Sequence, residues 1–411
     1  MVLGERKLEP VFQEPSLWKN KNFMFLWVGK VISNFGFQIY AIALPLLIYE
    51  LSKSALAMSM MRAVDFLPNI FIGMLAGVMV DRFNRKSIMK YAVLLQIVAL
   101  TGIVLLIFSD EIAVWHLYIL GFILTTSGYT FGNSQHSAIP QLVSKQQLTA
   151  ANAKLTFVDT FVSMVGPGLA GIIIAFYSFG LSFSLYLICL VIMLIFLLFV
   201  QVPPVEKVKK QQASVWADMK EGIHELFGNK TLLTPTIVTV FSNLSASLVI
   251  GVLIFYAADV LGASEKQIGF MFSFGAVGGL IGSLVITRLR KTLGRGKIYS
   301  WCLFIEIIGL AVLIFANTWW LIGLSLLIRS FAVIMSNVVY FTIRQEFTPN
   351  HLLGRVAGTS SMLMKLALPL GLFIAGLWAE FLPIPLLFVI STFITATLYV
   401  VVRRSSFSKV Q

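Results

Sequence analysis

The sequence GVMVDRFNRK, residues 77 to 86, lies between two long apolar runs and indicates how the chain is placed in a membrane. Asp81 stands directly beside Arg82, and Arg85 and Lys86 follow closely. A charged cluster this short between two apolar runs predicts a tight turn at a membrane face. Its three basic residues favour the cytoplasmic face, because short cytoplasmic loops retain Lys and Arg.

The composition is that of a membrane protein. Of the 411 residues, 58% are hydrophobic and only 12% are charged, which is too apolar for a soluble protein of this length. The net charge of +13 does not indicate nucleic acid binding, because the charges gather in the loops. No cleavable signal pattern is present. Cys189 and Cys302 both lie inside apolar runs, so no disulfide framework is implied.

Apolar runs long enough to cross a bilayer predict twelve helices. They lie at about 23–49, 55–80, 87–108, 114–136, 152–177, 180–201, 232–256, 267–287, 299–316, 319–341, 355–379 and 383–402. A β-barrel is excluded, because barrel strands alternate over about ten residues whereas these runs are apolar for about twenty. We therefore predict an all-α polytopic membrane protein.

The distribution of charge predicts the orientation. The inner loops, both tails and the adjoining helix ends hold 25 of the 31 Lys and Arg residues, and the outer loops hold two, Lys53 and Lys266. This asymmetry places both termini in the cytoplasm. The predicted units are a cytoplasmic tail (1–22), an N-terminal six-helix bundle (23–201), a cytoplasmic linker (202–231), a C-terminal six-helix bundle (232–402) and a second cytoplasmic tail (403–411). In the linker, Val215, Met219, Ile223 and Phe227 recur every four residues, which predicts an amphipathic helix on the membrane surface.

The two halves repeat each other. At an offset of 205 residues, Gly77, Arg85 and Lys86 recur as Gly282, Arg290 and Lys291. Pro167 recurs as Pro369 at an offset of 202, and Ser127 recurs as Ser330 at an offset of 203. A six-helix unit used twice predicts a pseudo-twofold axis along the membrane normal, with the solute site on that axis. Asp81 has no counterpart, because Ile286 holds its place.

These features resemble the major facilitator superfamily along nearly the whole chain. The loop at 77–86 is similar to the family's signature loop, although Asn84 stands where Gly is usual. AIPQLVSKQQLTAAN (138–152) and LGRVAGTSSMLMKLALPLG (353–371) resemble bacterial drug and macrolide exporters. The resemblance implies that Gly77, Asp81, Arg82, Arg85 and Lys86 form a conformational latch. Asp81 would face the start of the eleventh helix and help to hold an outward-open state.

The fifth predicted helix contains Gly166, Pro167 and Gly171, and the eleventh contains Pro369. Small residues allow close helix packing, and proline bends a helix by removing a backbone hydrogen bond. The first stretch resembles in part the family's antiporter motif, with Ala170 where Gly is usual. A packed kink and a direct role in coupling both stay open.

Seven ionisable residues fall inside the predicted helices: Lys30, Arg62, Asp65, Asp159, Glu306, Arg329 and Lys365. Each costs about 2.5–3.5 kcal/mol at the bilayer centre, so each should face water or a partner. Spacing and depth suggest three pairs, Arg62 with Asp65, Lys30 with Asp159 and Glu306 with Arg329, and leave Lys365 as a buried cation with no obvious partner.

An acid in a low-dielectric cavity can carry a proton near neutral pH. We therefore predict Asp159 and Asp65 as candidates for proton coupling, with Glu306 behind them, and structural ion pairs as the alternative. The family's drug/proton antiporters usually carry an Arg in the fourth helix, where this chain has Thr125.

In the superfamily the first, fourth, seventh and tenth spans line the central cavity. Here they supply the candidates Asn34, Gln38, Tyr40, Thr125, Tyr129, Asn243, Asn337 and Tyr340. A lining with few polar groups among Phe, Met, Leu and Ile suits an amphipathic solute. There is no P-loop sequence for ATP, and the four histidines show no ligand spacing, so we expect no cofactor, no metal and no enzyme activity.

We predict a secondary active transporter of the bacterial cytoplasmic membrane. The expected activity is proton-coupled export of drug- or macrolide-like amphipathic molecules by alternating access. The expected partners are that solute, a proton or another coupling ion, and the lipid bilayer; we expect a monomer. Uptake, transport of a lipid or siderophore, and a non-transporting membrane sensor stay open as alternatives.

Overall fold

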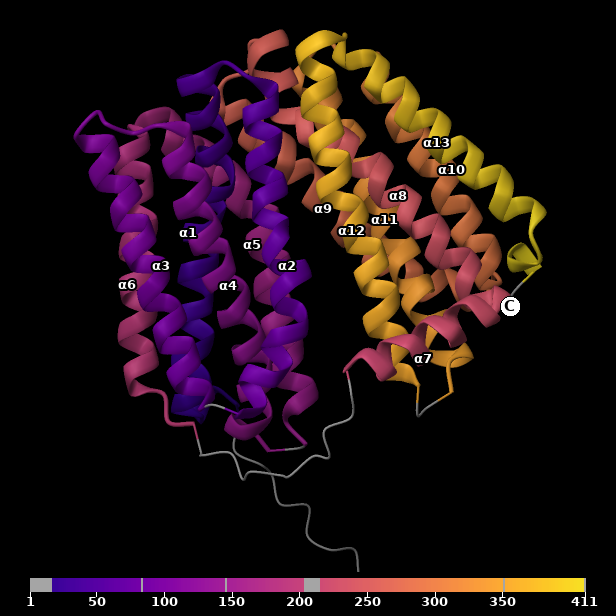
Figure 1. Cartoon of the computed structure of the whole chain (residues 1–411), viewed down its shortest axis with the longest axis horizontal. Helices are drawn as coiled ribbons and strands as arrows, with labels where there is room; N and C mark the ends of the chain where they lie inside the picture. The colour runs from indigo at the N-terminus through magenta and orange to yellow at the C-terminus, as the bar shows by residue number, and fades with distance from the viewer. Residues whose placement is uncertain (1–16, 83, 145, 203–214, 350–351, 410–411) are drawn as a thin grey trace, which may run out of the picture.

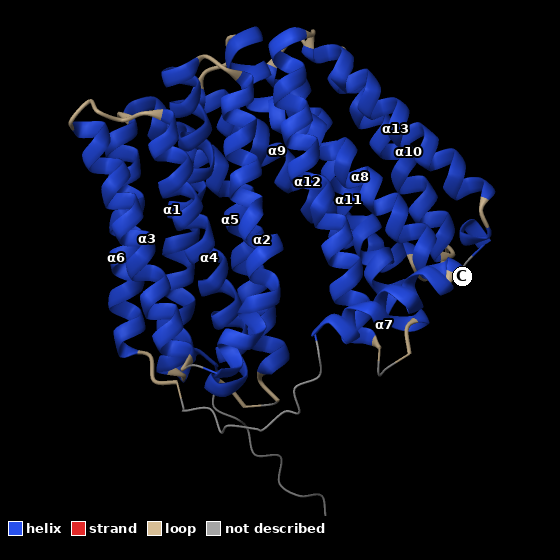
Figure 2. Ribbon diagram, in the orientation of Figure 1, coloured by secondary structure: helices blue, strands red, loops and turns tan. Residues whose placement is uncertain are grey.

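The structure is a computed structural model. It describes residues 17–82, 84–144, 146–202, 215–349 and 352–409, with the backbone alone for residues 69–82, 215–219 and 409. All regular structure in these residues is helical (Figure 2). The first sixteen residues, residues 203–214 of the predicted linker, and the side chains of Asp81 and Arg82 lie outside the described part.

Twelve long helices form two groups of six (Figure 1). The first group is α1 (Lys21–Ser52), α2 (Ala55–Arg82), α3 (Arg85–Phe108), α4 (Val114–Leu142), α5 (Leu148–Phe176) and α6 (Phe179–Phe199). The second is α8 (Lys230–Phe255), α9 (Glu265–Leu289), α10 (Arg295–Ile314), α11 (Trp319–Phe347), α12 (Leu353–Phe381) and α13 (Ile384–Arg404). Each predicted run coincides with one of them. Ten of the described helices are long and apolar enough to cross a membrane, and α2 and α4, of matching length, complete the bundles.

The two groups repeat one packing pattern. In the first bundle α1 packs against α5 and α6, and α3 packs against α4 and α6. In the second bundle α8 packs against α12 and α13, and α10 packs against α11 and α13. The contacts between bundles are symmetric too, because α5 lies on α9 and α2 lies on α12. This arrangement confirms the predicted fold class of two six-helix bundles related by a pseudo-twofold axis.

Short polar side chains begin several helices. The Asn20 side chain accepts a hydrogen bond from the amide of Phe23 at the start of α1. The Ser264 and Gln267 side chains form a capping box at the start of α9. Asn84 accepts hydrogen bonds from two amides of the first turn of α3. This N-cap gives a physical reason for Asn84 in the loop where the resemblance expects Gly, because Asn satisfies helix amides that Gly leaves bare.

The two ends of the molecule differ. We name the end that holds the helix starts at Lys21, Arg85 and Arg295 the basic end, and the other the opposite end. In Figure 1 the bundles meet at the opposite end, drawn at the top, and diverge toward the basic end. One hydrophobic core crosses between the bundles near the opposite end and joins Leu47 to Leu253. Toward the basic end the bundles have separate cores.

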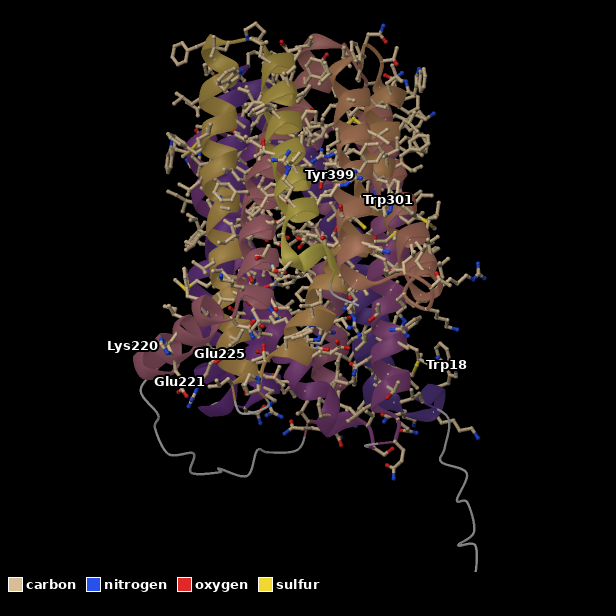
Figure 3. All side chains as sticks on the ribbon, turned by 90° about the vertical axis from the view of Figure 1, so that its right-hand side faces the viewer. Trp18, Lys220, Glu221, Glu225, Trp301 and Tyr399 are labelled. Atoms are coloured by element: carbon tan, nitrogen blue, oxygen red, sulfur yellow. The ribbon has the colours of Figure 1, made fainter. Side chains whose placement is uncertain are left out.

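A shorter helix, α7 (Val215–Gly228), lies across the basic end of the second bundle (Figure 1). Leu226 is 1% exposed in a small core with Val356 of α12. Glu221 forms an ion pair with Arg355, and Figure 3 shows Glu221 on the outer edge of the helix. Phe227 is exposed, as expected of a helix with an apolar edge at a membrane surface.

Candidate functional site

Helices α1 and α5 bring three predicted residues together. The Lys30 ammonium lies 2.8 Å from one carboxylate oxygen of Asp159, and the Asn34 amide donates to the other oxygen at 2.9 Å. Lys30 and Asn34 are four residues apart, so they lie on one face of α1. The Lys30 side chain is 8% exposed, whereas that of Asp159 is 50% exposed. The pair is therefore sealed on the side of the base and open on the side of the acid.

The glycines of α5 allow close packing on both of its sides. A side chain at Gly166 would overlap Gln38 of α1, the next residue on the face that carries Asn34. On the other side, the amide of Gly168 donates to the Ser273 hydroxyl of α9 at 3.0 Å. Gly171 faces Gly269 of α9 so closely that a Cβ on either residue would collide with backbone. Gly166 therefore allows close packing within the first bundle, and Gly168 and Gly171 allow it between the bundles.

A cavity of about 400 Å³ lies beside this contact, between the first bundle and the second. Its lining combines small, hydroxyl and apolar residues: Thr160, Ser163, Ile250, Phe272, Gly275, Ala276, Gly279, Leu280, Ser283, Leu326, Ser330 and Ile334. Asp159 does not line the cavity itself, but it directly precedes Thr160 and lies one helical turn before Ser163, toward the basic end. An acid thus lies next to a cavity whose walls come from both bundles.

Arg62 and Asp65 lie on α2 in the first bundle. The Arg62 guanidinium donates to the carbonyl oxygen of Ala41 at 2.9 Å. The Tyr40 hydroxyl donates to the Asp65 carboxylate at 3.2 Å. Each charged residue therefore finds a partner on α1, beyond the simple pair that their spacing suggests.

Glu306 of α10 and Arg329 of α11 face each other inside the second bundle. Their closest side-chain atoms are 3.8 Å apart, and the two residues are 4% and 6% exposed. Gly309 makes room for this pair, because a Cβ there would lie 2.5 Å from Cγ of Arg329. The depth argument correctly paired these residues, but the pair is enclosed in protein.

Lys365 of α12 has a partner in the other bundle. Its ammonium lies 5.8 Å from the centre of the Tyr129 ring of α4, within the range of a cation–π interaction. Pro369 follows one turn later, inside α12. This partner could not be predicted from the sequence, because the contact joins helices from different bundles.

The cavity candidates divide into two groups. Tyr40 and Tyr340 are 1% and 2% exposed, and Tyr340 shares a hydrogen bond with Thr236 inside the second bundle. These two tyrosines are core residues in this conformation, and the prediction that they line the cavity is corrected. The other candidates are partly exposed: Asn34, Gln38, Thr125, Tyr129, Asn243 and Asn337. Asn243 donates to the carbonyl oxygen of Met364 at 2.9 Å, which ties α8 to α12.

The predicted latch is described only in part. The backbone at Gly77, Asp81 and Arg82 belongs to α2, and their side chains lie outside the described residues. The Lys86 ammonium donates to the carbonyl oxygen of Leu198 at 2.9 Å, near the end of α6. Arg85, at the first position of α3, is partly buried.

At the opposite end, hydrogen bonds join the bundles through residues that the sequence analysis missed. The Tyr49 hydroxyl of α1 donates to Asp259 at 2.7 Å, in the π-helical turn that ends α8, Tyr256–Val260. Glu380 of α12 accepts from the Ser54 hydroxyl at 2.6 Å and from the amide of Leu56 at 3.1 Å. The presence of acids in short outer loops could have suggested such contacts, but nothing local in the sequence indicates which loops contact each other.

Among the described residues, no group of three or more His, Cys, Asp or Glu side chains is placed to hold a metal ion. The arrangement is that of two packed bundles with charges between and within them. It leaves space for a small solute between the bundles and a half-exposed carboxylate near that space.

Known proteins resemble this chain along most of its length. The macrolide efflux protein A of Streptococcus pyogenes is 26% identical over 373 residues, covering 88% of this chain and 90% of that protein. The enterobactin exporter EntS of Escherichia coli is 23% identical, covering 82% and 80%. In structure, the nucleoside transporter NupG superposes with a TM-score of 0.78 at 12% identity, covering 93% of this chain and 98% of that one.

The sequence model of the Major Facilitator Superfamily matches residues 26–362 and, in a second match, residues 236–409. These ranges include α2–α6 and α8–α13 in full and most of α1, with the α1–α5 ion pair and the contacts at the opposite end. Proteins of this family are membrane transporters and not enzymes. The chain belongs to the Major Facilitator Superfamily.

Proposed function

We propose that this transporter exports amphipathic, drug- or macrolide-like molecules in exchange for protons, by alternating access. The observation that carries the proposal is the half-exposed Asp159 carboxylate, paired with Lys30 beside a cavity that both bundles line. The efflux relatives support the solute class. So does the cavity wall, in which hydroxyls are few among apolar residues.

The proposed orientation places the basic end and both termini in the cytoplasm of a bacterial cell. The asymmetry of Lys and Arg supports it. The conformation described here is then closed to the outside and open toward the cytoplasm. The core shared near the opposite end and the separate cores toward the basic end support that assignment. A monomer contains the complete pathway.

In the proposed cycle, Asp159 exchanges its partners. As a carboxylate it is held by Lys30 and Asn34 of α1. A proton on Asp159 removes its charge and weakens both contacts, which loosens α5 from α1. Because α5 also packs on α9 of the second bundle, this change alters the contact about which the bundles rock. Asp65 and Glu306 are the secondary candidates for proton coupling. Each binds partners within its own bundle, so its protonation would affect the contact between the bundles less directly.

The proposed latch acts at the basic end in the other half of the cycle. When the bundles close there, Asp81 would meet the start of α12, with Gly77, Arg82, Arg85 and Lys86 shaping the turn. Neutralising Asp81 is expected to impair transport and to leave membrane insertion intact. Normal efflux by Asp81→Asn would remove the latch from the proposal.

The direct test uses the purified full chain in proteoliposomes with a radiolabelled macrolide. Asp159→Asn should lower accumulation driven by a pH gradient roughly 5–150-fold, the range of typical coupling free energies. Gradient-free exchange of the macrolide should persist. Asp110→Asn, an exposed acid at the opposite end, is the matched control and should behave as the unmodified protein.

Three results of this test are informative. Full gradient-driven accumulation by Asp159→Asn would contradict the coupling role. Loss of exchange as well as accumulation, with a normal melting temperature, would assign Asp159 to solute binding instead. No macrolide flux in any variant would contradict the solute class. A siderophore is then the next solute, because one relative is an enterobactin exporter.

A further inference from the structure

A second hollow, away from the space between the bundles, lies at the basic end of the second bundle. Its volume is about 910 Å³, and it is bordered by the α9–α10 loop, α10, the end of α13 and the residues that follow. The lining residues that matter here are Arg290, Lys291, Lys297, Arg403, Trp301 and Tyr399. Figure 3 shows Trp301 and Tyr399 near each other on the face formed by α10 and α13.

The pocket is strongly basic. It contains four cations, and no carboxylate is found among its described lining residues. Arg290, Lys291 and Lys297 are exposed and form no ion pair within the part of the chain that the structure describes. The Arg403 guanidinium donates to the Tyr399 hydroxyl at 2.6 Å, which directs its position without neutralising its charge. Such a site favours an anion.

The start of α10 adds to this preference. Its N-cap residue is Gly294, which lines the pocket and offers no side chain to the first helix amides. Uncapped amides at a helix start bind anionic groups such as phosphate. The basic pair Arg290 and Lys291 is the second copy of Arg85 and Lys86. Ile286 stands where the first copy has Asp81, so this copy of the sequence carries the two cations without the acid.

An apolar stripe leads away from the cations along α10. Lys297, Trp301, Phe304 and Ile308 follow one another at helical spacing, and the last three are 59%, 39% and 44% exposed. The rings of Trp301 and Phe304 are 5.8 Å apart, and those of Phe304 and Tyr399 are 5.7 Å apart. The stripe thus runs from a cation through aromatic rings to an aliphatic side chain. Membrane proteins show the same order from the headgroups of a bilayer toward its core.

We propose that this pocket binds the headgroup of an anionic phospholipid, whose acyl chains lie along the exposed stripe of α10. A free phosphate would use the cations alone, whereas a lipid also explains the exposed rings beside them. Basic pockets between transmembrane helices are known to take anionic headgroups. With the orientation proposed above, the lipid belongs to the inner leaflet.

The test measures tryptophan fluorescence of the full chain in nanodiscs of phosphatidylcholine with added brominated lipid. The signal of Trp301 is the difference between the protein and its Trp301→Phe variant. Brominated phosphatidylglycerol should quench this signal at lower mole fraction than brominated phosphatidylcholine. Lys297→Gln/Arg403→Gln should weaken the preference roughly 25-fold, because each cation near an anionic lipid contributes about fivefold.

The matched control is Lys230→Gln/Arg404→Gln, which removes the same charge from exposed residues outside the pocket lining. It should retain the preference, and melting temperatures will show that both double variants fold. Equal quenching by the two lipids would overturn the proposal and leave only ordinary bilayer contact. Equal loss in both double variants would indicate general surface charge. Release of the lipid by millimolar inorganic phosphate at constant ionic strength would assign the pocket to a free anion.

Discussion

Two ion pairs between long helices lie in different environments. Lys30 and Asp159 join α1 to α5, and the acid is half exposed beside the interbundle cavity. Glu306 and Arg329 join α10 to α11, and both are enclosed in protein. Similar chemistry therefore has different uses. An enclosed pair holds a bundle together, whereas the pair with one exposed member is the one that we propose to take part in proton coupling.

The largest expected effect is on the enclosed pair. Glu306→Gln should lower the free energy of unfolding by about 3–5 kcal/mol, because it leaves the Arg329 charge buried without a partner. Glu306→Met/Arg329→Met should recover most of that loss, since apolar side chains of similar volume replace a buried pair well. Chemical denaturation in detergent measures both variants. A normal stability for Glu306→Gln, together with lost proton-driven transport, would mean that the enclosed pair serves proton coupling and does not hold the bundle together.

Substitutions of Gly309 and Gly166, which lie near the two ion pairs, test the comparison of the pairs further. Gly309→Ala should cost about 1–3 kcal/mol, because its Cβ would collide with the Arg329 stem and lie 3.3 Å from the Arg329 backbone nitrogen. Gly166→Ala should cost less, because the atoms in its way all belong to the Gln38 side chain and none belongs to the backbone. The same denaturation measurement ranks them. A costlier Gly166→Ala would mean that the α1–α5 contact is the more rigid one.

The smallest stability effect is expected at the open pair. Lys30→Met should change the free energy of unfolding by about 0.2–1 kcal/mol, because solvent already screens the exposed Asp159 and Met preserves the apolar stem. Solute flux driven by a pH gradient should nevertheless fall, since the proposed exchange of partners by Asp159 loses its cation. Lys266→Met, at an exposed position near the start of α9, is the control and should alter neither property. A loss above 2 kcal/mol in Lys30→Met would make this pair structural.

The sequence predicted the parts that follow from local pattern and depth. All twelve spans coincide with helices, because a continuous apolar run leaves the backbone few alternatives in a membrane. The Lys30–Asp159 and Glu306–Arg329 pairs followed from similar depth on neighbouring helices. Tyr40 and Tyr340 were misassigned because polarity alone does not tell which way a residue of a cavity helix points.

The contacts between bundles were beyond sequence reasoning for another reason. Lys365 with Tyr129, Tyr49 with Asp259 and Ser54 with Glu380 join helices from different halves. These contacts belong to one conformation of a molecule that is proposed to adopt at least two. A sequence encodes both sets of contacts at once, so no local pattern identifies the set present in one state.

The hydrogen bonds that Asp259 and Glu380 accept at the opposite end have an energetic consequence. They are three in number, and each ends on a carboxylate oxygen, so each adds a net of about 1.5–3 kcal/mol. One elementary charge crossing a membrane potential of 100 mV releases about 2.3 kcal/mol. In the proposed cycle, the electrical work of one charge is therefore comparable to the cost of breaking one of these three outer contacts, so the other two need a further source of free energy such as solute binding.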